Sequence, residues 1–393
     1  MAFLTEHDKI YTTKEDICAH VGDDYADFMG AVTPPIFQTS LFVIPTEDNG
    51  VGELGYNYTR VNNPTIAVAE RKMAALEGGE GALCFGSGMA SITAAILHFV
   101  KKDSHVVMVR SIYGVTRVLL CDYLTKKLGL RVTAVNGDST DEILAQVRPD
   151  TALIFLESPS SAVFKLQDLK AIADFARPRG IGTVIDNTYA TPLYQNPLTY
   201  GIDLVCHTVS KYLGGHSDIV GGVTIGSRQR IEQISGERFL LGANMDPHQA
   251  WLMIRGIRTL PLRLRQHAEN ALKVARFLEG HPYIQRVIYP ALESFPQREL
   301  VNKYLSGYNG LLSFVPDGTP DSIRKMISKC RHFQHGVSWG GFESLIVSIS
   351  VGAGKEDAAA SDVPVNLVRI HVGLENAGTL IEDLGQALKY LRQ

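Results

Sequence analysis

Short apolar runs alternate with longer segments of helical spacing through the middle of the chain. The apolar runs predict strands at residues 82–85, 106–109, 131–134, 152–156, 182–186, 204–208 and 222–225. Helical spacing lies between most of them, as at 64–76, 87–99, 115–127 and 169–177. Such alternation is typical of a mostly parallel sheet covered by helices on both faces.

The two ends of the chain follow other patterns. Residues 1–62 contain Pro34-Pro35 and a glycine-rich stretch at 49–55, which predict an extended arm. Near Gly256 the pattern changes to a basic helix at 258–278, followed by a smaller α/β region. We therefore expect an arm over 1–62, a main domain over 63–256 and a C-terminal domain over 257–393.

Composition narrows the class of protein. The 393 residues carry 38 lysines and arginines against 41 acidic residues, a net charge of −3 that favours neither nucleic acid nor an anionic membrane as partner. Five scattered cysteines without CxxC spacing argue against a disulfide framework and a zinc site. The charged N-terminus is not a signal peptide, and no apolar run is long enough to span a bilayer. These features predict a cytoplasmic protein without a metal site.

Two of the predicted strands lead to side chains that could take part in catalysis. The run 182–186 ends in Asp186, and Lys211 follows the run 204–208 within His207-Thr208-Val209-Ser210-Lys211. In a parallel sheet both positions fall at the carboxyl ends of strands, where ligands bind. An amine and a carboxylate there suit pyridoxal phosphate (PLP): the amine forms a Schiff base and the carboxylate keeps the pyridine nitrogen protonated. A lone lysine is more usually a solvated surface residue, so the rest of the chain must decide.

Glycines and an aromatic residue follow two earlier strands. Gly86-Ser87-Gly88-Met89 joins a strand to a helix, and such a turn either binds a phosphate or serves only the turn. Tyr113 follows the strand at 106–109, where it could stack on a cofactor ring or belong to the core.

Three further positions have two readings each. Tyr58 and Arg60 alternate in the arm at the spacing that phosphate recognition needs, although an exposed loop pair has the same pattern. Arg369 lies in an apolar strand and needs a partner, which a substrate carboxylate or a structural acid would supply.

Taken in order from residue 30 to residue 375, these motifs resemble the Cys/Met-metabolism PLP-dependent enzymes, which include cystathionine β-lyase, cystathionine γ-lyase, cystathionine γ-synthase and methionine γ-lyase. The resemblance implies the aspartate-aminotransferase type of PLP fold (fold type I), with an amino acid as the small-molecule substrate. It also implies a homo-oligomer, usually a tetramer built as a dimer of dimers.

The resemblance assigns roles to residues of this chain. Lys211 would form the Schiff base, Asp186 would pair with the pyridine nitrogen and Tyr113 would stack on the ring. The phosphate would be held by Gly88, Met89, Thr208 and Ser210, and by Tyr58 and Arg60 from a neighbouring subunit. Ser338 and Arg369 would hold the substrate carboxylate, with Trp339 beside them.

Pocket details separate the activities within the family. Val337 stands where γ-synthases and γ-lyases typically carry glutamate, and Ser338-Trp339-Gly340-Gly341 resembles the β-lyase version. Val115 replaces the cysteine typical of methionine γ-lyases, and Ser161-Ala162 replaces the usual Asn-Pro. We expect a carbon–sulfur lyase; a γ-replacement enzyme is the alternative. A binding protein that kept the fold is a third reading, against which the intact Lys211 and Asp186 argue.

Overall fold

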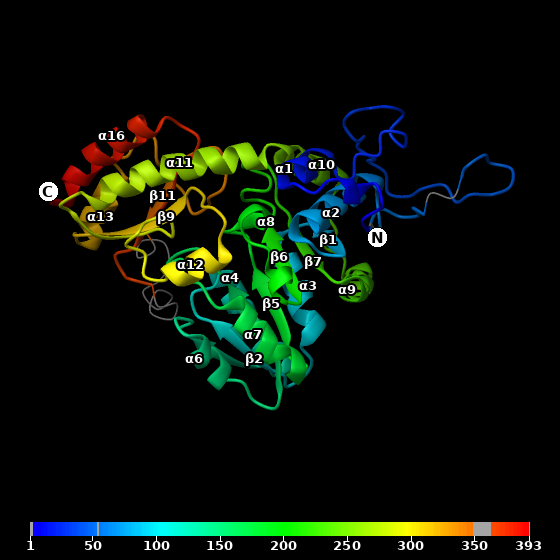
Figure 1. Ribbon diagram of the computed structural model, residues 1–393, viewed down its shortest axis with the longest axis horizontal. Helices are drawn as coiled ribbons and strands as arrows, with labels where there is room; N and C mark the ends of the chain where they lie inside the picture. Colours follow the sequence, from blue (N-terminus) through cyan, green and yellow to red (C-terminus); the bar gives the residue numbers. More distant parts are fainter. Residues whose placement is uncertain (1–2, 53–54, 349–362, 393) are drawn as a thin grey trace.

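The larger of two sheets forms the centre of the molecule (Figure 1). The computed structural model describes residues 3–52, 55–348 and 363–392. Seven strands run in the order β1-β7-β6-β5-β4-β2-β3; β7 pairs antiparallel with both β1 and β6, and the other neighbouring pairs are parallel. Their bounds are β1 Gly81–Phe85, β2 His105–Val109, β3 Arg131–Val135, β4 Thr151–Glu157, β5 Gly182–Asp186, β6 Leu204–Thr208 and β7 Gly222–Gly226. The mostly parallel sheet predicted from the alternation is confirmed.

Helices cover both faces of this sheet. On β1, Ala82 and Cys84 pack into one apolar cluster, whereas Leu83 and Phe85 pack into another. Because successive side chains of a strand point to opposite faces, both faces must be covered. The helices in contact with its strands include α2 Pro64–Glu77, α3 Gly88–Phe99, α6 Thr140–Ala145, α7 Leu169–Ala176 and α9 Arg228–Leu241. The same part of the chain also contains α4 Gly114–Val118, α5 Thr125–Leu128, α8 Thr191–Tyr194 and α10 Pro247–Arg258.

Local sequence sets the ends of the helices nearest the site. Asn63 caps α2 through a bond from the Thr65 amide, and Pro64 takes the first helical position, where its missing N–H costs nothing. The helix ends at Gly78 in the left-handed conformation. Ser87 caps α3 by accepting from the Ala90 amide, which turns the chain sharply from β1 into the helix.

A second sheet lies in the C-terminal part, with strand order β10-β11-β12-β9-β8. Its strands are β8 Ile284–Ile288, β9 Leu311–Pro316, β10 Gln334–His335, β11 Leu345–Ser348 and β12 Val368–His371. The long helix α11, Leu260–Glu279, runs from beside α10 to this sheet (Figure 1). Other helices that the structure describes in this part are α12 Arg298–Tyr304, α13 Pro320–Ile327 and α16 Ala377–Leu388.

The expected arm precedes α2. It contains the short helix α1, Lys14–His20, and the described residues between α1 and α2 form no long element and include a loop that projects from the body (Figure 1). Several large apolar side chains of this stretch are exposed, among them Met29, Val43 and Ile44. Within the part of the chain that the structure describes, none of the helices combines the length and apolar character needed to cross a bilayer.

Candidate active site

A cavity of about 410 Å³ opens at the carboxyl ends of β4, β5 and β6, beside the start of α3. Ten of the twelve residues singled out in the sequence line it: Gly88, Met89, Tyr113, Asp186, Thr208, Ser210, Lys211, Ser338, Trp339 and Arg369. They come from segments more than 250 residues apart, and the two sheets with their loops bring them together. Glu157 and Ser161 also line the cavity.

Lys211 lies partly buried in the turn after β6. Its Nζ atom donates to Ser338 Oγ at 2.6 Å and lies 5.3 Å from the centre of the Trp339 ring. Burial first, and the nearby positive charge of Arg369 second, lower the pKa of Lys211 to about 8, while Asp186 acts in the opposite direction. A substantial fraction of its amine is therefore neutral near pH 8, as a nucleophile or base requires.

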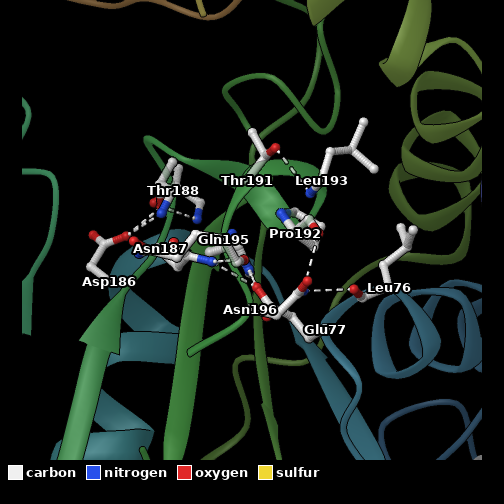
Figure 2. A network of polar contacts seen from close by, with 12 residues as sticks. Leu76, Glu77, Asp186, Asn187, Thr188, Thr191, Pro192, Leu193, Gln195 and Asn196 are labelled. Carbon is white, nitrogen blue, oxygen red and sulfur yellow. Dashed lines mark hydrogen bonds and ion pairs between the residues drawn. The ribbon is translucent and has the colours of Figure 1, made fainter. Parts of the chain in front are cut away.

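Asp186 ends β5 and is almost fully buried. Its Oδ1 atom accepts hydrogen bonds from the amide and the hydroxyl of Thr188 (Figure 2). Burial raises the pKa of Asp186, and the Thr188 bonds with the nearby His207 and Lys211 oppose that rise. A buried carboxylate held in this way is suited to pair with a positively charged group that enters the cavity.

Behind Asp186 a buried polar network joins the ends of β5 and β6 to α2 (Figure 2). Glu77 Oε1 accepts from Asn187 Nδ2 at 2.8 Å and lies 2.5 Å from His207 Nε2. Gln195 donates to Asn187 Oδ1 at 2.9 Å and to a carbonyl oxygen of the loop after β4 at 2.6 Å. The network fixes the strand ends that carry Asp186 and lead to Lys211.

The start of α3 faces Thr208 across a very short gap. A Cβ atom built on Gly88 would lie 2.1 Å from Thr208 Oγ1, so only glycine fits there. The first amides of a helix have no partner inside the helix and carry a partial positive charge. Together with the Thr208 and Ser210 hydroxyls they form a cradle suited to a phosphate group.

Arg369, on β12, forms the opposite side of the cavity. Its guanidinium donates to the carbonyl oxygens of Ser161 at 3.1 Å and of Val337 at 2.7 Å. Burial lowers the pKa of Arg369 to about 10, and the charge of Glu157 opposes that shift. Two neutral carbonyls fix the guanidinium without cancelling its charge, which leaves it suited to a carboxylate ligand.

Tyr58 and Arg60 lie apart from this cavity. The Arg60 guanidinium lies 5.4 Å from the centre of the Tyr58 ring and 4.8 Å from that of Phe239, and it donates to the Phe239 carbonyl. The two side chains are neighbours, as their spacing predicts, but the arm holds them against α9 of their own chain. They do not contribute to the cavity of the same chain.

Glu157 is a site residue that the sequence patterns did not single out. It ends β4 directly opposite Asp186 on β5, and burial followed by the charge of Asp186 raises its pKa to about 8. An acid directly after the predicted strand at 152–156 was the available signal, similar to the acid that ends the predicted strand at 182–186.

Comparison with known proteins identifies the class. Residues 15–389 match the model of the Cys/Met metabolism PLP-dependent enzymes, and the chain belongs to that family. It is 39% identical over 374 residues to an L-methionine gamma-lyase of Porphyromonas gingivalis, covering 92% of this chain and 94% of the relative. It is 36% identical over 381 residues to a cystathionine gamma-lyase of Bacillus subtilis, covering 96% and 99%.

Solved structures agree with the fold. The structure of metB from Corynebacterium glutamicum matches with a TM-score of 0.92 and 32% identity, over 98% of this chain and 100% of that chain. Cystathionine gamma synthase from Xanthomonas oryzae pv. oryzae, in complex with aminoacrylate and cysteine, matches with a TM-score of 0.91 and 32% identity, over 97% and 98%. The predicted fold class and family are confirmed, and the protein is a PLP-dependent enzyme.

The cavity fits the cofactor of this family. A helix start and two hydroxyls form a phosphate cradle, a buried carboxylate lies on one wall, and an amine of lowered pKa lies on another. This donor set matches the three polar ends of PLP, namely its phosphate, its ring nitrogen and its aldehyde.

Proposed function

We propose that this protein is a PLP-dependent carbon–sulfur lyase that removes sulfur groups from sulfur amino acids and releases keto acid and ammonia. One observation carries the proposal: Lys211 and Arg369 lie on one cavity, so an amino acid bound there by its carboxylate presents its α-carbon to the lysine amine. The most similar relatives named above are both lyases, which favours elimination.

The cofactor contributes an electron sink that stabilises negative charge on the substrate α-carbon. Asp186 would keep the ring nitrogen of the bound cofactor protonated, and Tyr113 would pack against the ring. Gly88, Met89, Thr208 and Ser210 bind the phosphate. Arg369 and Ser338 hold the substrate carboxylate in a fixed orientation, with Trp339 beside them.

Lys211 carries the proton transfers in this proposal. Its amine would take the proton from the α-carbon of the bound amino acid. A leaving group on the β-carbon then departs directly, whereas loss from the γ-carbon first needs a second proton removed from the β-carbon, which Lys211 or Tyr113 can accept. The residues around the cavity, including Val115, Val337 and Trp339, then decide which bond breaks.

A γ-replacement enzyme, joining a thiol to an activated homoserine, is the second candidate. It is favoured by the similarity to a solved cystathionine gamma synthase. A panel of cystathionine, methionine, cysteine and an O-acylhomoserine with added thiol separates the two. Keto acid and ammonia from the sulfur amino acids support the lyase, and a thioether formed only from the O-acylhomoserine would replace it with the alternative.

We further propose a cytoplasmic homotetramer, built as a dimer of dimers, in which 63–256 binds PLP and 257–393 closes the substrate side. Tyr58 and Arg60 then reach the phosphate of a second copy by way of the arm, 1–62. Their place outside the cavity of their own chain and the exposed apolar side chains of the arm support this arrangement.

A further inference from the structure

Glu157 is a buried carboxyl group in the cavity to which the proposed reaction gives no step. It is 4% exposed, lines the same cavity as Lys211 and lies opposite Asp186 in the sheet register. Burying a second acid beside Asp186 is costly, and the cost shows in the raised pKa of Glu157, about 8. A group placed at such cost calls for an explanation.

The two oxygens of Glu157 bind the loops that follow β2 and β4. Oε2 accepts from the Tyr113 amide at 2.6 Å, and Oε1 accepts from the Ser161 amide at 2.7 Å. Both bonds are short, as expected for the ionised carboxylate, which predominates above the pKa of about 8. Because Glu157 lies at the end of the buried strand β4, its two hydrogen bonds anchor both loops to the sheet.

The Ser161 loop in turn holds Arg369. The Ser161 carbonyl oxygen accepts from the Arg369 guanidinium at 3.1 Å. The amide of the same residue donates to Glu157. A shift of the Ser161 peptide would therefore move the anchor point of the guanidinium. The Tyr113 amide, at the other oxygen, sets the start of α4 and hence the position of the Tyr113 ring.

We propose that Glu157 is a positioning residue that fixes Tyr113 on the cofactor side and, through the Ser161 carbonyl, Arg369 on the substrate side. This inference rests on the proposed role of Arg369 as the anchor of the substrate carboxylate. The proposal predicts a selective effect. Loss of the Glu157 carboxylate should weaken the binding of a ligand that has a carboxylate more than the binding of a ligand that has only an amine.

Glu157→Gln tests this with almost no change in shape. A glutamine oxygen can accept from one of the two amides, but its NH2 group must then face the other. Glu142→Gln is the matched control, because Glu142 also accepts from a backbone amide, that of Asn136 at 3.1 Å, and it is absent from the residues that line the cavity.

Two small ligands separate the effects on the PLP-loaded proteins at about pH 9, where the pKa of about 8 leaves Glu157 mostly ionised. Glycine has an amine and a carboxylate, whereas methylamine has the amine alone. The concentration that half-saturates the change in cofactor absorbance should rise for glycine by about tenfold or more in Glu157→Gln, as loss of a bond to a charged group implies. For methylamine it should stay within about twofold, and Glu142→Gln should leave both unchanged.

Equal weakening for glycine and methylamine, or wild-type values for both, would overturn the proposal. If Glu157→Gln does not fold, Glu157→Asp gives the same test, because its shorter side chain reaches only one of the two amides. The readout needs a bound cofactor and no turnover. A wild-type protein that binds glycine but releases no keto acid would therefore reject the lyase proposal and leave this one standing.

Discussion

The ammonium nitrogen of Lys211 lies 2.6 Å from the hydroxyl oxygen of Ser338, a residue 127 positions later in the chain. This bond joins the main sheet to the C-terminal part at the cavity. It also shows that the lysine side chain points into the cavity, where burial and Arg369 lower its pKa to about 8. Burial and the charges of Arg369 and Asp186, two residues from distant segments, thus set the protonation state of one amine.

The first prediction concerns the pH dependence of cofactor loading. Attack on the aldehyde of PLP requires neutral Lys211, so the loading rate of the cofactor-free protein should rise with pH and level off above about pH 8. Arg369→Gln removes a positive charge that lowers this pKa, so the rise should move to higher pH. Stopped-flow absorbance at several pH values measures both.

Lys211→Ala is the control for that measurement, since it should show no covalent loading after borohydride reduction and lose turnover by a factor of about 10³ or more. Lys170→Ala, which removes an exposed lysine on α7, should behave as wild type. A loading rate that does not change between about pH 6 and pH 9 would contradict a lysine of lowered pKa.

The second prediction concerns substrate choice at Val337. This side chain is 76% exposed yet lines the cavity, and its carbonyl oxygen accepts from Arg369. Val337→Glu places a carboxylate where the distal ammonium of cystathionine could meet it. The ratio of kcat/KM for cystathionine over that for methionine should rise by up to about fivefold, because an exposed ion pair contributes at most about 1 kcal/mol.

Val337→Gln has nearly the same size as Val337→Glu without the charge and should leave the ratio unchanged. Steady-state assays of keto acid release on both substrates give the numbers. An equal rise in the two variants would mean that side-chain size, rather than charge, sets the preference.

The third prediction concerns the stability of the network behind Asp186. Glu77 is fully buried and accepts from Asn187 Nδ2 at 2.8 Å and from Asn196 Nδ2 at 3.2 Å, besides its contact with His207. Glu77→Ala removes the hydrogen-bond partner of His207 Nε2 and one acceptor of each asparagine amide, and each buried hydrogen bond lost costs about 1–3 kcal/mol. Unfolding free energy should therefore fall by at least about 3 kcal/mol in denaturant titrations.

Glu232→Ala removes an exposed acid on α9 and should change the unfolding free energy by no more than about 0.5 kcal/mol. If the two substitutions cost the same, Glu77 does not support the strand ends in the way that Figure 2 suggests.

The local elements could be predicted from the sequence because they depend on local patterns. Each strand of the main sheet is a short apolar run bounded by turns, and the predicted runs at 182–186 and 204–208 coincide with β5 and β6. Asp186, at the end of the first run, and Lys211, after the second, lie at the same edge of the sheet because the carboxyl ends of parallel strands meet there.

What the sequence did not reveal depends on contacts between distant segments. Gly256 was placed at a change of pattern but lies inside α10, where a Cβ would come within 2.4 Å of the Leu213 and Gly214 carbonyl oxygens. The glycine is needed for the close approach of α10 to the turn that carries Lys211. Likewise, Glu157 matters through amides of two separate loops, and no periodicity reports such contacts.

The fourth prediction concerns the proposed contribution of Arg60 to a neighbouring subunit. Arg60→Ala and Lys211→Ala should each be impaired alone, the first through weakened PLP retention and the second through loss of the amine. If Arg60 acts across the interface, a mixed dimer contains one site with both defects and one with neither. Mixing the two purified variants under conditions that exchange subunits should therefore restore up to about a quarter of wild-type activity, as random pairing implies.

The arrangement of the arm makes this test decisive. Arg60 lies against Phe239 of its own chain and outside the cavity that contains Lys211, so a defect confined to one chain has no structural route to that chain's own site. A mixture of Lys211→Ala with the double variant Arg60→Ala/Lys211→Ala, which has no lysine to restore, provides the control and should stay inactive. If mass spectrometry shows that mixed dimers form but activity does not recover in the first mixture, Arg60 acts at the active site of its own chain.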